Sequence, residues 1–160
     1  MQKLCPSTDA EGVERYGVQI ISEGQVFDVG GRKLQTVHIP GHTSGSIGLI
    51  DEATGILLSA DSVLKRMLIF QTRGIFLDGL KRLEHYDYHD ILGAHWPEPL
   101  GRHQVRRAIN LLEDYRPDME VAAPWIMGGR VEEFRMFHRG TNFDDPEFVA
   151  FGYMAGNSIG

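Results

Sequence analysis

Cysteine is nearly absent from this chain, and its scarcity removes whole classes of site. Cys5 is the only cysteine among 160 residues, so the chain forms neither an internal disulfide nor a cysteine-based metal cluster. No apolar run approaches the length of a membrane span, and the first residues hold no apolar core of signal-peptide length. We therefore expect a cytoplasmic protein with no membrane partner.

An excess of basic residues is also missing. The formal net charge is −6, which argues against a nucleic-acid partner but leaves a small-molecule substrate open, including an anionic one held by metal. Apolar residues make up 42% of the chain and charged residues 24%, ordinary values for a globular protein. The length suits one domain with an adequate core.

The pattern along the chain predicts a polar, disordered lead-in over residues 1–15 and one partial domain over residues 16–160. Alternating apolar residues and turn signals predict strands at 18–21, 25–29, 33–39, 46–50, 55–59, 90–94 and 131–137. Helical spacing predicts helices over 75–86 and 105–112. We expect an irregular loop over 62–74 and a Gly- and Asn-rich tail over 141–160 whose aromatic residues pack on another part of the structure.

Polar residues stand where several of these strands end. Pro40 and Gly41 end one extended run and place His42 on a tight turn. Asp61 closes the apolar strand that ends in Ser59-Ala60, and His95 follows the short buried strand 90–94. Because neighbouring strands deliver their ends to one sheet edge, we expect these three side chains to converge within roughly 10 Å, as ligands of one metal centre must.

These residues resemble the second half of the metallo-β-lactamase fold. The matching features, in family order, are Pro40-Gly41-His42-Thr43-Ser44-Gly45-Ser46, a hairpin around 52–55, Ala60-Asp61, a helix and Gly93-Ala94-His95. The resemblance covers roughly residues 18–115 and is specific because several matches occur in order. It implies an α/β fold, the α-β-β-α sandwich, of which this chain carries the C-terminal half.

The resemblance also implies a metal site. In a complete member His42 would bind one ion, His95 a second ion, and Asp61 would bridge them as the catalytic carboxylate. The His and Asp donors suit two zinc ions, and also iron or manganese. A metal-activated water would then attack an ester, thioester, amide or phosphoester. The isolated chain is expected to bind metal weakly or not at all.

Departures from the family pattern are as informative as the matches. The family's first metal motif, His-x-His-x-Asp-His, does not occur in this sequence, where no two of the seven histidines are separated by a single residue. Ala60 stands where the family usually has Gly. Trp96 replaces a Gly after the last histidine, and we expect it to narrow the pocket and bind substrate, although a loop that has drifted would also explain it. Together with the loop over residues 65–74, Trp96 is expected to shape the pocket.

Each assignment has a plainer alternative. His42 would otherwise bond its own turn, and Asp61 would otherwise cap the segment that follows it. His85 and His89 are predicted to form a surface pair, His38 to be structural, and His103 to begin a helix. Ser44 and Ser46 lack the surroundings of a nucleophile and are expected to satisfy loop backbone groups.

Two functions follow from the pattern. The first is a metal-dependent hydrolase of which this chain carries only part of the site. The second is a non-catalytic domain that keeps the fold for binding or assembly. Because a half-sandwich leaves an apolar sheet face uncovered, we expect a homo-oligomer or a complementing N-terminal half as partner. The alternative is that residues 143–153 fold back over that face.

Overall fold

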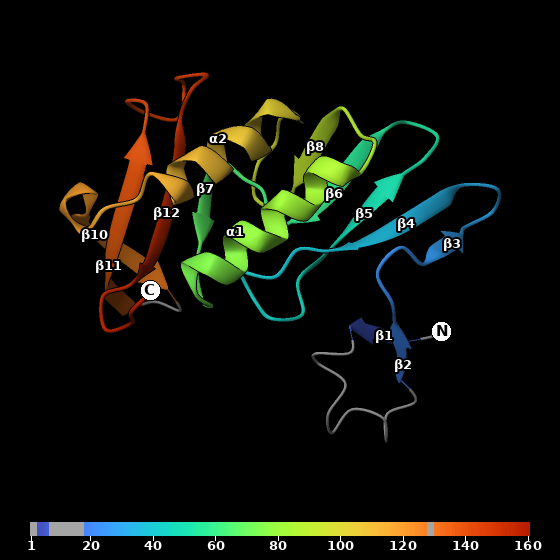
Figure 1. Ribbon diagram of the computed structural model, residues 1–160, viewed down its shortest axis with the longest axis horizontal. Helices are drawn as coiled ribbons and strands as arrows, with labels where there is room; N and C mark the ends of the chain where they lie inside the picture. The colour runs from blue at the N-terminus through green and yellow to red at the C-terminus, as the bar shows by residue number, and fades with distance from the viewer. Residues whose placement is uncertain (1–2, 7–17, 128–129) are drawn as a thin grey trace.

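The computed structural model describes residues 3–6, 18–127 and 130–160. Its main layers are a six-stranded sheet, a four-stranded sheet, and two helices, α1 and α2, that run side by side across them (Figure 1). The larger sheet has the strand order β3-β4-β5-β6-β8-β9. Its strands are β3 (Val26–Asp28), β4 (Lys33–His38), β5 (Ile47–Asp51), β6 (Ile56–Ala60), β8 (Asp90–Gly93) and β9 (Leu100–Gly101).

Strand pairing brings the ends of β6 and β8 to the same edge. The pairs β4–β5 and β5–β6 are antiparallel, whereas β6 and β8 are parallel. Parallel neighbours need a crossover connection, which here contains α1 (Arg73–Arg82). The C-terminal ends of β6 and β8 therefore lie at the same edge of the sheet. The loop between β4 and β5 lies at this edge too.

The four-stranded sheet corrects one expectation from the sequence and confirms another. Its order is β10-β11-β12-β7, with β10 (Val121–Met127), β11 (Arg130–Arg139), β12 (Val149–Met154) and β7 (Arg66–Leu68). The irregular loop expected over 62–74 is therefore wrong for β7, which pairs in parallel with β12. The expectation that the tail's aromatic residues pack on another part of the structure is confirmed, since Phe151 of β12 is fully buried.

Both predicted helices form, with shifted ends. The first begins earlier than expected because the Thr72 side chain caps it, accepting a hydrogen bond of 3.3 Å from the Ile75 amide. It ends at Arg82 and continues as a short 3₁₀ turn, Leu83–His85. The second, α2, covers His103–Glu113, and His103 begins it as expected.

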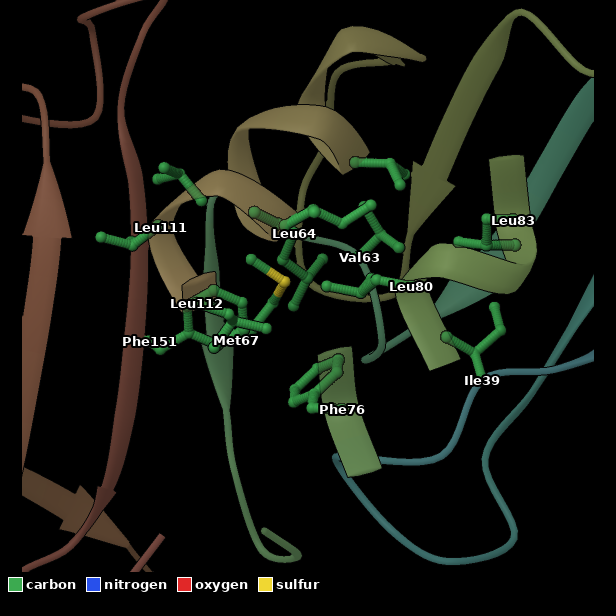
Figure 2. Close-up of a cluster of buried hydrophobic side chains, with 14 of the residues drawn as sticks. Ile39, Val63, Leu64, Met67, Phe76, Leu80, Leu83, Leu111, Leu112 and Phe151 are labelled. Atoms are coloured by element: carbon green, nitrogen blue, oxygen red, sulfur yellow. The ribbon is translucent and has the colours of Figure 1, made fainter. Parts of the chain in front are cut away.

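A continuous core joins the helices to both sheets. Ile50, Leu57 and Ile91 are paired neighbours on β5, β6 and β8, and all three are buried in the core that includes the helices. Figure 2 shows Phe76 and Leu80 of α1 meeting Met67 of β7 and residues of α2 and β12. The core therefore fixes the six-stranded sheet relative to the four-stranded one.

The opposite face of the six-stranded sheet is apolar and open. Leu49, Leu58 and Leu92 are paired neighbours along it, and the Leu58 side chain is 39% exposed. A shallow hollow of about 340 Å³ on this face is lined mainly by apolar side chains, among them Leu34 and Ile56. The segment 143–153 packs elsewhere, since β12 pairs with β11 and β7 and Phe143 stacks on Trp96, while Leu58 on this face stays exposed.

The expected lead-in over residues 1–15 falls largely outside the described residues. Within it, β1 (Lys3–Pro6) pairs in parallel with β2 (Val18–Ile21). Among the helices of the described chain, none has the length and apolar character that crossing a bilayer requires.

Candidate metal centre

The three predicted ligands meet at one edge of the six-stranded sheet. His42 Nε2 lies 3.6 Å from Asp61 Oδ2, and His95 Nε2 lies 3.3 Å from Asp61 Oδ1. The predicted convergence within roughly 10 Å is therefore confirmed. Each histidine faces a different oxygen of the same carboxylate.

Hydrogen bonds to neighbouring backbone hold the His42 loop in place. The Gly41 carbonyl accepts bonds of 3.2 Å from the amides of Phe70 and Gln71. His42 Nδ1 lies 3.3 Å from the Leu68 carbonyl oxygen of β7. Because a carbonyl only accepts, Nδ1 carries the proton in the neutral ring, and Nε2 presents its lone pair to Asp61.

The helix α1 also shapes this loop. Gly41 has a φ of +144°, and a Cβ built on it would lie 2.2 Å from Cγ of the buried Phe76. A Cβ on Gly79 would lie 2.6 Å from the Pro40 carbonyl oxygen. Glycine at both positions lets the helix approach the loop closely enough to fix where His42 stands.

Ala60, the residue before Asp61, has a strained backbone conformation. Its φ is +49°, the only positive value at a non-glycine position in the described chain. Alanine, at a position where the family usually has Gly, therefore places a Cβ in a left-handed backbone that disfavours it. The pairing of β6 with β8 shifts register between Leu58 and Ala60, and Asp61 follows this irregularity with its carboxylate beside the two histidines.

Replacing Ala60 with Gly should stabilise the protein. The left-handed conformation costs an L-residue roughly 1–2 kcal/mol, and the added freedom of Gly in the unfolded chain offsets part of the gain. We expect Ala60→Gly to raise the free energy of unfolding in urea by about 0.5–1 kcal/mol. Ala108→Gly is the comparison at an ordinary helical position, since Ala108 lies buried within α2, and it should lose about 1 kcal/mol of helix propensity plus roughly 0.8 kcal/mol for the buried methyl group. A loss of stability in Ala60→Gly would contradict the strain.

The His95 loop is tied to the same strand end. The Ala94 amide donates a 2.9 Å hydrogen bond to the Ala60 carbonyl, so the residues before Asp61 and His95 are bonded to each other. The His95 side chain is 78% exposed and that of His42 is 21% exposed. The site is therefore open on the His95 side.

A cavity of about 540 Å³ adjoins the three residues. Its apolar wall includes Leu64, Leu68, Phe70, Trp96 and Phe143. Trp96 stacks on Phe143 with ring centroids 5.7 Å apart, and Lys65 Nζ lies over the indole at 5.2 Å while donating to the Phe143 carbonyl. The placement of Trp96 beside the ligands agrees with the expected position of a pocket residue.

Arg66 and Phe143 also line the cavity. Arg66 lies in the segment 65–74 that was expected to shape the pocket, whereas sequence reasoning missed Phe143. These two residues come from β7 and from the segment before β12, and they reach the site only because those distant segments are neighbours. The apolar run 67–70 and the aromatic residues of the tail are visible in the sequence, but neither indicates which segment it packs against.

The remaining histidines lie elsewhere, as predicted. His38 Nε2 lies 2.7 Å from the Ser44 carbonyl oxygen, a structural contact. His89 is 70% exposed beside Asp90. Ser46 Oγ accepts a 3.0 Å bond from the Thr43 amide, which is the expected backbone role.

Three donors are fewer than a closed site requires. In the described part of the chain, no group of three His, Cys, Asp or Glu side chains is arranged around one common point that would hold a metal ion. The geometry instead consists of two separate pairs, each made of one histidine and one oxygen of Asp61.

The comparisons with known proteins identify the family. The family model of the metallo-beta-lactamase superfamily matches residues 5–123, which is more than half of the chain. The chain belongs to the metallo-beta-lactamase superfamily. Acyl-coenzyme A thioesterase MBLAC2 of Homo sapiens is 44% identical over 50 residues, covering 31% of this chain and 18% of that protein.

Solved structures share the fold. A metallo-beta-lactamase from Pontibacter korlensis matches with a TM-score of 0.55 and 14% identity, covering 72% of this chain and 59% of that one. A metallo-beta-lactamase family protein from Thermus thermophilus matches with a TM-score of 0.52 and 21% identity, covering 67% and 42%. A variant flavo di-iron protein from Thermotoga maritima matches with a TM-score of 0.54 and 15% identity, covering 70% and 36%. The chain thus covers 36–59% of these solved structures and 18% of the thioesterase.

Proposed function

We propose that this chain supplies His42, Asp61 and His95 to the metal centre of a metal-dependent hydrolase. The supporting observation is the arrangement of atoms that can bind a metal. With its Nδ1–H on the Leu68 carbonyl, the neutral His42 ring presents its Nε2 lone pair to Asp61 Oδ2, which lies 3.6 Å away. Two facing lone pairs repel unless a proton or a cation lies between them.

The second oxygen of Asp61 supports the same proposal. Asp61 Oδ1 is buried and makes no hydrogen bond to any described residue, although His95 Nε2 lies 3.3 Å away. Burying a carboxylate oxygen without a donor is costly, and a bound cation removes that cost. The residues present therefore fit one half of a two-ion zinc centre; iron or manganese would also suit these donors.

The chain's own residues have distinct roles in this proposal. Asp61 would bridge the two positions, the Leu68 carbonyl would hold His42 in its tautomer, and Trp96 would shape the substrate pocket. When bound, the metal would supply acidified water for hydrolysis near neutral pH. The short match to an acyl-coenzyme A thioesterase favours a thioester among the bonds expected from the sequence.

A zinc titration tests the ligand set. Calorimetry of the chain should show weak zinc binding, because three donors serve two positions. Losing one ligand should weaken it by at least about tenfold, since even outer-shell partners are worth 10- to 100-fold. His42→Ala and His95→Ala should both show this loss, whereas His85→Ala should not. Unchanged zinc binding in the first two variants would refute the assignment.

The isolated chain should show negligible hydrolase activity. The family's first motif, which would complete the centre, does not occur in this sequence. We expect no zinc-dependent turnover of an acyl thioester, a generic ester or a lactam above the buffer rate. Turnover that His42→Ala abolishes would contradict this prediction and show that three ligands suffice.

A non-catalytic binding or assembly domain is the second candidate. The open apolar face of the six-stranded sheet favours it, since such faces mark sites of association. Absence of zinc binding together with stable association through this face would favour this function over the hydrolase.

A further inference from the structure

We infer that the cavity beside the metal centre binds an amphiphilic anion, a molecule with an apolar chain or ring and a carboxylate or phosphate group. The anion would lie on Arg66 and the apolar part on Trp96, Phe143 and Leu68. This inference deepens the proposed function and rests on it for the identity of the substrate, but the binding itself requires no metal.

The apolar part of the argument comes from the walls of the cavity. Trp96 and Phe143 stack with an interplanar angle of 28° and form one continuous aromatic surface. Phe143 is 40% exposed and Phe70 is 37% exposed, so large apolar side chains stand open to water at this cavity. Exposed apolar surface beside a concave site favours an apolar ligand.

The buried donor on the same wall adds a polar contact. Trp96 Nε1 is buried and donates to no acceptor in the described chain. An indole N–H normally finds a partner when buried, and a ligand oxygen would supply one after a small shift of the ring. The wall thus combines apolar area with one donor.

The anionic part of the argument comes from Arg66. Its guanidinium lies over the Phe143 ring at 5.4 Å and lines the cavity together with Asp61. Partial burial lowers the pKa of Arg66, yet arginine stays charged at neutral pH. A guanidinium over a ring keeps its donors in its own plane, where they match the geometry of an oxyanion.

The anion-binding arginine and the candidate metal ligands belong to different sheets. Arg66 belongs to β7 of the four-stranded sheet, whereas Asp61 and His95 follow strands of the six-stranded sheet. A ligand anchored on Arg66 would therefore extend its uncharged part along Trp96 toward Asp61. In that orientation the uncharged part of the bound molecule, rather than its anionic group, lies beside the candidate metal-binding residues.

Fluorescence of Trp96 tests the inference. Trp125→Phe leaves Trp96 as the sole tryptophan, and metal-free protein is titrated with decanoate, decyl phosphate, decanol and decyltrimethylammonium below their micelle concentrations. At least one of the two anions should bind about tenfold more tightly than decanol, the usual worth of a charged hydrogen bond. The cation should bind more weakly than decanol. The two anions distinguish a carboxylate site from a phosphate site.

Variants distinguish the contribution of the Arg66 charge from that of the apolar wall. Arg66→Gln should bring the anions to within about threefold of decanol, Arg66→Lys should keep part of the preference, and Phe143→Ala should weaken all four ligands alike. Arg116→Gln, an exposed arginine elsewhere on the surface, is the matched control and should change nothing. Equal binding of all four ligands, no binding at all, or an unchanged preference in folded Arg66→Gln would overturn the inference. Because zinc is absent, failure of the hydrolase proposal would leave these results intact.

Discussion

Gly41→Ala is expected to destabilise the protein by about 3 kcal/mol or more and to displace His42. Two costs combine at this position. The φ of +144° is unfavourable for an L side chain, and the added Cβ would lie 2.2 Å from the ring of Phe76. Phe76 is fully buried, so it has no room to move away. Urea unfolding measures the stability, and zinc titration of the folded fraction reports the position of His42.

A second glycine provides the control for Gly41. Gly31 has a φ of +89°, but a Cβ built on it would contact nothing within 4 Å. Gly31→Ala therefore carries the conformational cost alone, about 1 kcal/mol. The difference between the two variants measures the clash with Phe76. Equal losses in both variants would show that the helix does not constrain the loop.

The isolated chain is expected to associate through the open face of the six-stranded sheet. Leu58 and Leu92 are neighbours on this face, and burying a leucine contributes about 1.5–3 kcal/mol. Leu58→Lys with Leu92→Lys should therefore weaken association by more than tenfold. Light scattering at micromolar concentration should give a mass above 18.0 kDa for the unaltered chain and a monomer mass for the double variant.

An exposed apolar residue elsewhere provides the comparison. Ile75 on α1 is 40% exposed, so Ile75→Lys changes the charge without touching the sheet face and should leave the mass unchanged. A clean monomer mass for the unaltered chain, with no dye binding to apolar surface, would contradict the association. The occupant we propose in the cell is a polypeptide carrying the first metal motif, and a second copy of the chain would substitute for it in isolation.

The convergence of the three candidate ligands was predictable because each is marked locally. Pro40-Gly41 ends one strand, the run 56–60 ends in Asp61, and the strand before His95 is short and apolar. Parallel pairing of β6 with β8 then places two of them at one edge. Turn residues and strand lengths carry this information without reference to distant parts of the chain.

The pocket was predictable only in part, because the segment 65–74 and Trp96 were expected to shape it, whereas Phe143 was not. β7 has three residues and no periodicity of its own, and its partner β12 lies about eighty residues further along the chain. Arg66 and Phe143 therefore meet through a pairing that no local pattern specifies. The β10 strand was missed for a related reason, since Pro124 within it argues against a strand.

In the proposed hydrolase, substrate range and metal chemistry would depend on separate parts of this molecule. The candidate ligands follow strands of one sheet, whereas Arg66 and Phe143 reach the cavity from the segments that form the other. Lys65 Nζ donates hydrogen bonds to the carbonyls of Phe143 and Asp145. The position of this wall therefore depends on a contact that involves none of the candidate metal ligands. Substitutions in β7 or in residues 143–147 can accordingly change which molecules are accepted while the histidines and Asp61 stay as they are. Directed evolution of selectivity would therefore start from these segments.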